Sequence, residues 1–155
     1  MCSSDLVESD YRADTTDRTL LGHSWGGLFA LYALFHQPGL FQRYVVVSSD
    51  LPFDYEQKYA ERHDSLPVRM YLASGESELN VEGLSSFESF ISTLQGRQYA
   101  GFTLTQQLIA NCTHCAVVAP AFQAGLVAVF FSFISFFYIT RKPAWDLSGN
   151  IHWKT

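Results

Sequence analysis

The sequence predicts an α/β fold with a mostly parallel sheet, in which strands and helices alternate along a chain of 155 residues. Two observations carry this prediction. Short runs of strand-forming apolar residues are separated by longer segments with helical periodicity. In addition, 48% of the residues are hydrophobic and only 16% are charged, which is enough apolar material for a sizeable core. Such alternation favours crossover helices on the faces of a parallel sheet.

The first half of the chain predicts two strands around one helix. Residues 18–22 form a short strand that ends at a glycine, and residues 25–35 have the apolar density of a buried helix that stops near Pro38. Residues 44–48 form a second strand, which the apolar run predicts to be buried and which is followed by Pro52.

The second half continues the alternation. Residues 68–73 form a third strand just after Pro67, and residues 81–94 place their apolar side chains at helical intervals, as an amphipathic helix does. Residues 102–109 give a last strand, and a last helix is expected to start after Pro120.

Charge and cysteine content exclude several classes of protein. The net charge is −5 and no cluster of basic residues occurs, so nucleic acid is excluded as a partner. The N-terminus is acidic and has no apolar core, so no signal peptide is readable and the localisation stays undetermined. Cys112 and Cys115 form a C-x-x-C pair without a second pair, which is too little for a structural zinc site. We therefore predict no metal and no cofactor.

An uncharged stretch covers residues 98–140, and within it residues 125–139 are almost entirely apolar. Arg141 and Lys142 follow, as at the flank of a membrane segment, but the apolar run is short for a membrane span. We predict a buried C-terminal helix that continues into a poorly folded tail. Membrane association through residues 125–139 is the alternative.

The sharpest local motif is the G-x-S-x-G pattern around Ser24, which lies between a predicted strand and a predicted helix. In such a nucleophile elbow the serine adopts a strained backbone, and Gly22 and Gly26 would let the strand and helix approach each other. The turn would place the Ser24 hydroxyl at the N-terminus of the helix. It would also aim the Trp25 backbone N–H at a developing oxyanion.

Several segments around this elbow resemble the esterase group of the α/β-hydrolases, most of all the enterochelin and related siderophore esterases. The matching residues are Tyr11-Arg12, Asp17 to Leu20, Gly22 to Ala30, Pro38 to Phe41 with the strand at 44–48, Val68 to Glu78, and the loop Asn111 to Ala116. The resemblance covers roughly residues 11–126. It implies a three-layer α/β-hydrolase-type fold and hydrolysis of carboxylic esters by a Ser-His-acid mechanism.

A serine hydroxyl needs a base that accepts its proton, and in this superfamily the chain order is serine, acid, histidine. His114 follows the last predicted strand, in a loop before a helix, where it could reach back over the sheet. His23 lies inside the elbow, and we expect its side chain to point away from that of Ser24. The other histidines are His36, His63 and His152, which lie at a helix end, in a charged connection and in the tail. The predicted base is therefore His114.

Three carboxylates are candidates for the acid that orients His114. Glu78 occupies the G-x-x-E position after the strand at 68–73, and it is the residue we favour. Glu76 lies two residues earlier, and Asp50 follows the strand at 44–48, a position that some relatives of the superfamily use. A Ser-His dyad without an acid also stays open.

The chain departs from this family at both ends. Related esterases have several strands before the elbow, and an early loop donates the second oxyanion N–H, but only 23 residues precede Ser24. We therefore expect an N-terminally truncated sheet whose strand at 18–22 becomes an exposed edge prone to self-association. The expected division is a non-family segment at 1–10, a partial catalytic region at 11–126 and a divergent tail at 127–155.

The function predicted from these residues is a serine hydrolase that acts on small carboxylic esters. Two alternatives belong to other classes. One is an inactive binding module that keeps the elbow only as architecture, and the other is a small membrane-associated protein dominated by residues 125–139.

Overall fold

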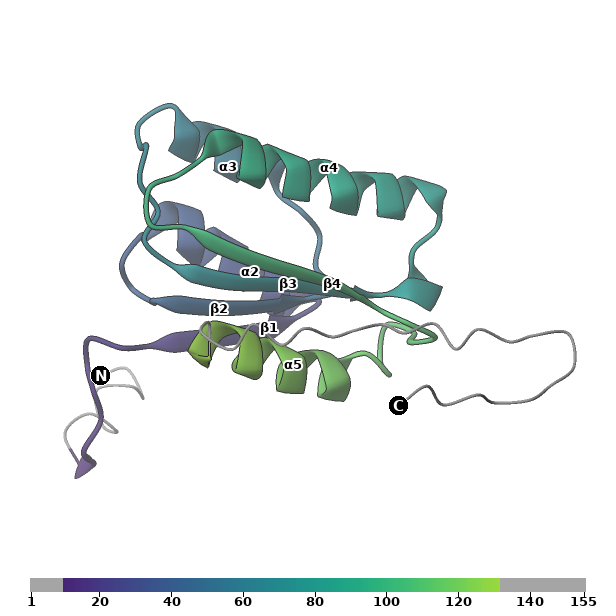
Figure 1. Cartoon of the computed structure of the whole chain (residues 1–155), viewed down its shortest axis with the longest axis horizontal. Coiled ribbons are helices and arrows are strands. Elements are labelled where there is room, and N and C mark those ends of the chain that lie inside the picture. Colours follow the sequence, from purple (N-terminus) through teal and green to yellow (C-terminus); the bar gives the residue numbers. More distant parts are fainter. Residues whose placement is uncertain (1–9, 132–155) are drawn as a thin grey trace, which may run out of the picture.

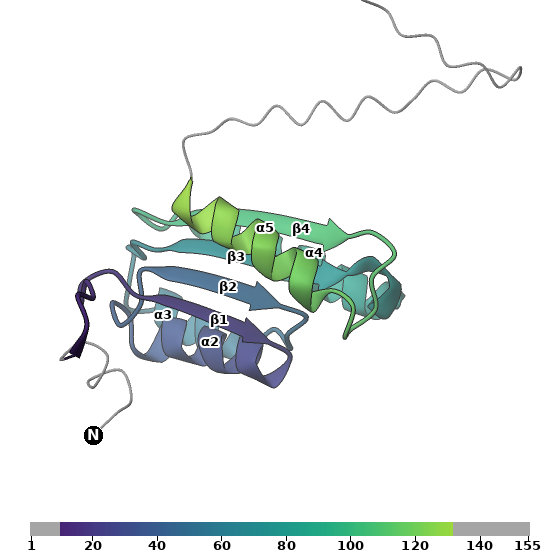
Figure 2. The same ribbon diagram turned by 90° about the horizontal axis from the view of Figure 1, so that it is seen from below.

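The computed structural model describes residues 10–131 and contains one parallel sheet of four strands. The strands are β1 (Thr19–His23), β2 (Arg43–Val47), β3 (Arg69–Gly75) and β4 (Thr103–Ile109), and they lie side by side in chain order. Figure 2 shows β1 at one edge of this sheet, with all four strands pointing the same way. The parallel sheet confirms the predicted fold class.

Helices cover both faces of the sheet, which makes three layers (Figure 1). One face carries α2 (Trp25–His36), α3 (Phe53–Ala60) and α4 (Val81–Arg97), and the other carries α5 (Val118–Phe130). A short 3₁₀ helix, η1 (Glu76–Glu78), links β3 to α4. Each crossover between neighbouring strands passes through a helix, as parallel pairing requires.

The two central strands are buried on both faces, which explains their continuous apolar sequences. Tyr44 and Val46 of β2 pack in the core beneath α2, α3 and α4, whereas Val45 and Val47 belong to the core beneath α5. A Cβ at Gly125 would collide with side chains of the sheet, so this glycine lets α5 pack closely. The core therefore continues through the sheet and holds the strand ends in fixed positions.

The predicted strands and helices all occur, with ends shifted by a few residues. The last helix begins at Val118, two residues before Pro120, whereas the sequence predicts a start after this proline. Pro120 lies in its first turn, where the missing N–H has no helical acceptor to lose. No sequence pattern predicts α3, because its buried face consists of Glu56 and Tyr59 and so lacks an apolar period.

The predicted apolar segment at 125–139 is described only in part. Its first residues belong to α5, which ends at Phe130, and residues 132–139 lie outside the described part of the chain. Within residues 10–131, no helix has both the length and the apolar character needed to span a membrane.

Candidate active site

Ser24 forms the turn between β1 and α2 and has an unusual backbone conformation. Its φ is 56° and its ψ is −122°, which is costly for a residue with a side chain. The Ser24 N–H donates to the carbonyl of Val47 at 2.9 Å, and the Ser24 carbonyl accepts from the Leu28 N–H at 3.0 Å. Bonds to β2 and to α2 therefore hold the turn in its strained form.

Glycine is needed at this turn, although the positions differ in part from those predicted. A Cβ at Gly22 would collide with the backbone of Gly26 and Gly27, as expected for a strand that touches the following helix. A Cβ at Gly26 would meet no described atom within 4 Å, whereas one at Gly27 would lie 2.8 Å from Cβ of Ser49. The close contacts thus fall on Gly22 and Gly27, and the predicted role of Gly26 is not supported.

Trp25 is the first residue of α2, so its backbone N–H is one of the four amides that have no acceptor within the helix. The indole itself is 77% exposed. This amide lies next to the Ser24 hydroxyl in the chain and at the positive end of the helix dipole. It is therefore suited to stabilise an anion that forms at Ser24.

Glu78 lies at the end of η1 and accepts hydrogen bonds through both carboxylate oxygens. Its Oε1 accepts from Ser48 Oγ at 2.5 Å, Ser74 Oγ at 2.8 Å and the Gly75 N–H at 2.6 Å. Its Oε2 contacts Nδ1 of His114 at 2.6 Å. The three donors on Oε1 fix the carboxylate and leave Oε2 for the histidine.

Burial and hydrogen bonding act in opposite directions on Glu78, whose side chain is 11% exposed. Burial raises the pKa of the carboxyl, and the hydrogen bonds from Ser48, Ser74, Gly75 and His114 lower it by more. The resulting pKa lies below the ordinary value of 4.5. The group is therefore ionised at neutral pH.

His114 lies in the loop between β4 and α5, and its side chain is 48% exposed. The Ser77 N–H donates to the carbonyl of Cys112 at 3.1 Å, which ties this loop to η1. A Cβ at Gly75 would collide with the same carbonyl, so glycine at the end of β3 permits the approach. The contact between Glu78 and His114 follows from this close packing.

The two alternative carboxylates lie elsewhere. Oε2 of Glu76 accepts from the backbone N–H of Asn111 at 3.3 Å. The Glu76 side chain therefore holds the backbone of the histidine loop and does not contact the His114 ring. Asp50 is exposed in the loop after β2. Of the three candidates, Glu78 is the one that contacts His114.

Ser24 and His114 are not joined by a hydrogen bond among the described residues, and the Ser24 hydroxyl does not cap α2. Such bonds are often long in enzymes without substrate and shorten in the complex. The structure brings His23, the neighbour of Ser24, against His114 instead. Nε2 of His23 lies 2.8 Å from the His114 carbonyl oxygen, and the ring centroids are 4.5 Å apart.

Three residues at this site were not predicted from the sequence: Ser48, Ser74 and His23 in its contact with the loop. Ser48 and Ser74 follow or end the buried strands β2 and β3, and their hydroxyls converge on one carboxylate oxygen. A hydroxyl at the carboxyl end of a buried strand was a usable signal, since neighbouring parallel strands end along the same edge. The contact of His23 had no such signal, because β1 and β4, which precedes the loop, lie at opposite edges of the four-stranded sheet.

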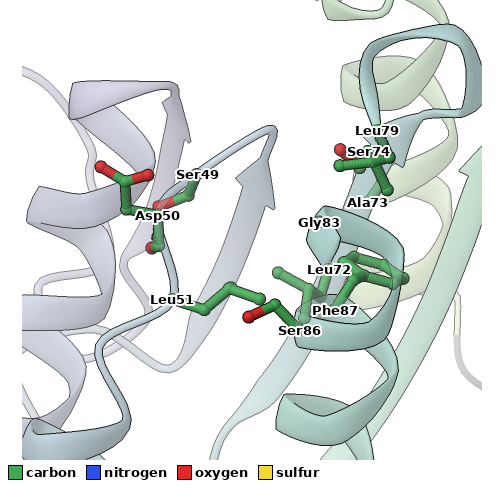
Figure 3. Close-up of a pocket in the computed structure, with 10 residues that line it drawn as sticks. All are labelled: Ser49, Asp50, Leu51, Leu72, Ala73, Ser74, Leu79, Gly83, Ser86 and Phe87. Carbon is green, nitrogen blue, oxygen red and sulfur yellow. Dashed lines mark hydrogen bonds between the residues drawn. The ribbon is translucent and has the colours of Figure 1, made fainter. Parts of the chain in front are cut away.

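A pocket of about 260 Å³ adjoins the acid on the side of the sheet covered by α4. Figure 3 shows it between the loop at Ser49 to Leu51 and the end of β3 with the start of α4. Leu51, Leu72, Leu79 and Phe87 give it an apolar lining, and hydroxyls come from serines including Ser74. Because Ser74 also donates to Glu78, the pocket and the acid share a side chain.

Cys112 and Cys115 are free thiols on either side of His114. Within residues 10–131, no three side chains of the metal-binding types converge on one point.

The three-layer fold and the strand-turn-helix geometry at Ser24 define an α/β-hydrolase-type protein. A family model with the description "Putative esterase" matches residues 4–103. The match covers more than half of the sequence, and the chain belongs to this esterase family.

Similar proteins include ferri-bacillibactin esterase BesA of Bacillus subtilis, which is 35% identical over 81 residues, or 46% of this chain and 28% of that protein. The BES protein from Bacillus cereus has a similar structure, with a TM-score of 0.72, 20% identity and coverage of 82% of this chain and 51% of that one. Siderophore hydrolase EstA from Aspergillus nidulans gives a TM-score of 0.69, 23% identity and coverage of 86% and 54%. The chain thus spans about half the length of these solved structures, and less of the curated relative.

Proposed function

We propose that this chain carries the nucleophile, base and acid of a serine hydrolase that cleaves carboxylic esters. The observation that supports this best is the 2.6 Å contact between Glu78 and His114, at the same edge of the sheet as the strained turn at Ser24. Membership of the esterase family gives independent support.

In the proposed reaction, Ser24 Oγ attacks the carbonyl carbon of the ester while its proton passes to Nε2 of His114. The Trp25 N–H donates to the oxyanion of the tetrahedral intermediate. The C–O bond to the alcohol then breaks, and His114 returns the proton to the leaving oxygen. Water repeats these steps on the acyl-enzyme and releases the acid.

Glu78 would act through His114 rather than on the substrate. Its Oε2 accepts the Nδ1 proton, which leaves the lone pair on Nε2 free to take the proton of Ser24. The negative charge of the carboxylate would also stabilise the imidazolium that forms in each half-reaction. The low pKa of Glu78 keeps this charge in place throughout the neutral range.

The substrate class is a small carboxylic ester, with siderophore esters as the finer proposal. The names of the similar proteins carry this finer proposal, since they include a ferri-bacillibactin esterase and a siderophore hydrolase. The pocket that includes Ser74 is lined by apolar side chains together with Asp50 and three serines, and its apolar part is suited to an uncharged part of such a substrate.

Labelling with a fluorophosphonate tests the proposed function. We expect covalent labelling of the full chain at Ser24, no labelling of Ser24→Ala, and hydrolysis of p-nitrophenyl acetate by the wild type alone. Ser89→Ala is a suitable control, because this serine is exposed on α4 and does not line the pocket. Folded wild-type protein that is neither labelled nor active would contradict the proposal and favour an inactive binding module.

Self-association through the edge of β1 stays a prediction. Among the described strands, β1 has a neighbour on one side only. On α2, which packs on β1, the side chains of Trp25, Phe29 and Tyr32 are exposed at helical spacing. Light scattering over a range of protein concentrations tests the idea, and a constant monomeric mass would count against it.

A further inference from the structure

Two contacts of His114 hold its loop, one through the ring and one through the backbone carbonyl. The proposed mechanism uses only the contact to the ring. Glu78 holds the ring through Nδ1 at 2.6 Å. The backbone carbonyl of the same residue contacts Nε2 of His23 at 2.8 Å. Because the His114 side chain is about half exposed, burial alone does not fix where it lies.

His23 is well placed to fix the loop, since its own backbone is part of the sheet. It is the last residue of β1 and pairs with Val47 of β2. The next residue is Ser24, whose N–H is also bound to β2. A side chain that starts from this position therefore moves with the serine turn.

The chemistry of the contact determines the direction of the hydrogen bond. A carbonyl oxygen only accepts, so Nε2 of His23 must carry a proton and donate. The neutral ring then has its free lone pair on Nδ1. The two histidine rings also touch, with centroids 4.5 Å apart and planes inclined by 46°.

We propose that His23 is a positioning residue, whose Nε2–H bond to the His114 carbonyl ties the histidine loop to the strand that carries Ser24. The contact joins β1, at one edge of the described sheet, to the loop that follows β4, at the other edge. It thereby sets the separation between the serine and histidine side chains. This role in catalysis rests on the proposed function, whereas the structural tie does not. A displacement of about 1 Å between catalytic groups can cost about 10²-fold in rate.

Three variants of His23 separate the hydrogen bond from ring packing. His23→Phe keeps a ring but removes the donor, His23→Ala removes both, and His23→Gln keeps an N–H donor at nearly the same reach as Nε2. We expect kcat for p-nitrophenyl acetate to fall about 10- to 100-fold in His23→Phe and His23→Ala with little change in KM. In His23→Gln we expect kcat to stay within a few-fold of the wild type.

Amide hydrogen exchange provides a readout that does not depend on activity. We expect faster exchange in residues 111–117 for His23→Phe than for the wild type and His23→Gln, with unchanged exchange in α4. NMR of the His23 ring should find the proton on Nε2. Unchanged exchange in His23→Phe, or a proton on Nδ1 alone, would overturn the proposal. If exchange changes as expected but the wild type is inactive, the tie stands and the proposed esterase function fails.

Discussion

Two carboxylates in this protein, those of Glu56 and Glu78, are both largely buried and hydrogen-bonded, but they have different partners. Glu56 of α3 is 1% exposed and accepts from Arg97 and Tyr99, which lie in and just after α4. Glu78 is also largely buried and accepts from two serines, an amide and His114. Both acids are fully paired, so burial and pairing alone do not mark a functional carboxylate.

The partners make the difference. Arg97 stays protonated throughout the accessible pH range. Burial, together with the hydrogen bond to Glu56, raises the pKa of the Tyr99 hydroxyl, so neither of these two side chains releases a proton near neutral pH. His114 carries an imidazole, which can both accept and donate a proton, and its side chain is 48% exposed. The first cluster joins α3 to α4, and the second fixes His114, the proposed base, at the carboxyl ends of the strands.

The largest expected effect comes from Glu78→Gln. The amide cannot balance the imidazolium charge and can donate to Nδ1, so kcat/KM should fall about 10³- to 10⁴-fold. The unfolding midpoint in urea should change little, because the amide keeps acceptors for the serines. Kinetics on an activated ester and urea unfolding measure the two effects.

Glu56→Gln is the matched control for this variant. It should leave kcat/KM per folded molecule within a few-fold of the wild type. An equal loss of activity in both variants would mean that the two carboxylates do not differ in role.

The next effect is on stability and comes from Glu56→Ala. The buried hydroxyl of Tyr99 would lose its acceptor, and we expect unfolding to cost about 2 kcal/mol less. Arg97 adds little to this figure, because its side chain is 39% exposed and water replaces the lost partner.

Asp54→Ala is the surface control, since Asp54 pairs with exposed Lys58 and should contribute under about 0.5 kcal/mol. Urea unfolding of both variants provides the test. A loss for Glu56→Ala no larger than for Asp54→Ala would show that the buried cluster does not stabilise α3.

A smaller effect is expected for Ser48→Ala. This change removes one of three donors to Oε1 of Glu78, which should lower kcat/KM about tenfold. The pKa of Glu78 should rise toward its ordinary value, because a bond that favours the ionised form is lost. Carbon-13 NMR of the carboxyl follows this titration. An unchanged pKa in Ser48→Ala would rule out this hydrogen bond as a cause of the shift.

The smallest expected effect is on how the free energy of unfolding depends on pH under acidic conditions. The pKa of Glu78 is lower in the folded chain than its ordinary value of 4.5, so ionised Glu78 stabilises the fold above that pH. This contribution is lost as the pH falls from 4.5 through the folded pKa. Urea unfolding between pH 6 and 3 should therefore show a shallower decline in Glu78→Gln. Parallel profiles would mean that Glu78 adds no pH-dependent stability.

Much of the fold could be predicted because its sequence signals are local. The apolar runs of β2 and β3 and the periodicity of α4 depend on neighbouring residues only. Glu56 and Tyr59 illustrate the limit. Glu56 accepts from Arg97 and Tyr99, and the Tyr59 hydroxyl donates to the carbonyl of Ser65, so the polar partners of this buried face lie outside α3. No pattern within eight residues reveals such partners.

The site was predictable where chain order carries information. The elbow at Ser24, the acid after β3 and the histidine after β4 follow from the motif and from the family resemblance. Ser48 and Ser74 depend on β2 and β3 lying side by side with matching ends, which is a property of the sheet register. The contact of His23 depends on how far the loop after β4 reaches across the sheet.

The positive φ of Ser24 also bears on how this sequence can change over generations. Glycine adopts such a conformation without penalty, so Ser24→Gly would relieve about 1 to 3 kcal/mol of strain. A lineage in which the hydroxyl had no use would gain stability from that single substitution. Under the proposed function the strained serine is retained because glycine would remove the nucleophilic hydroxyl.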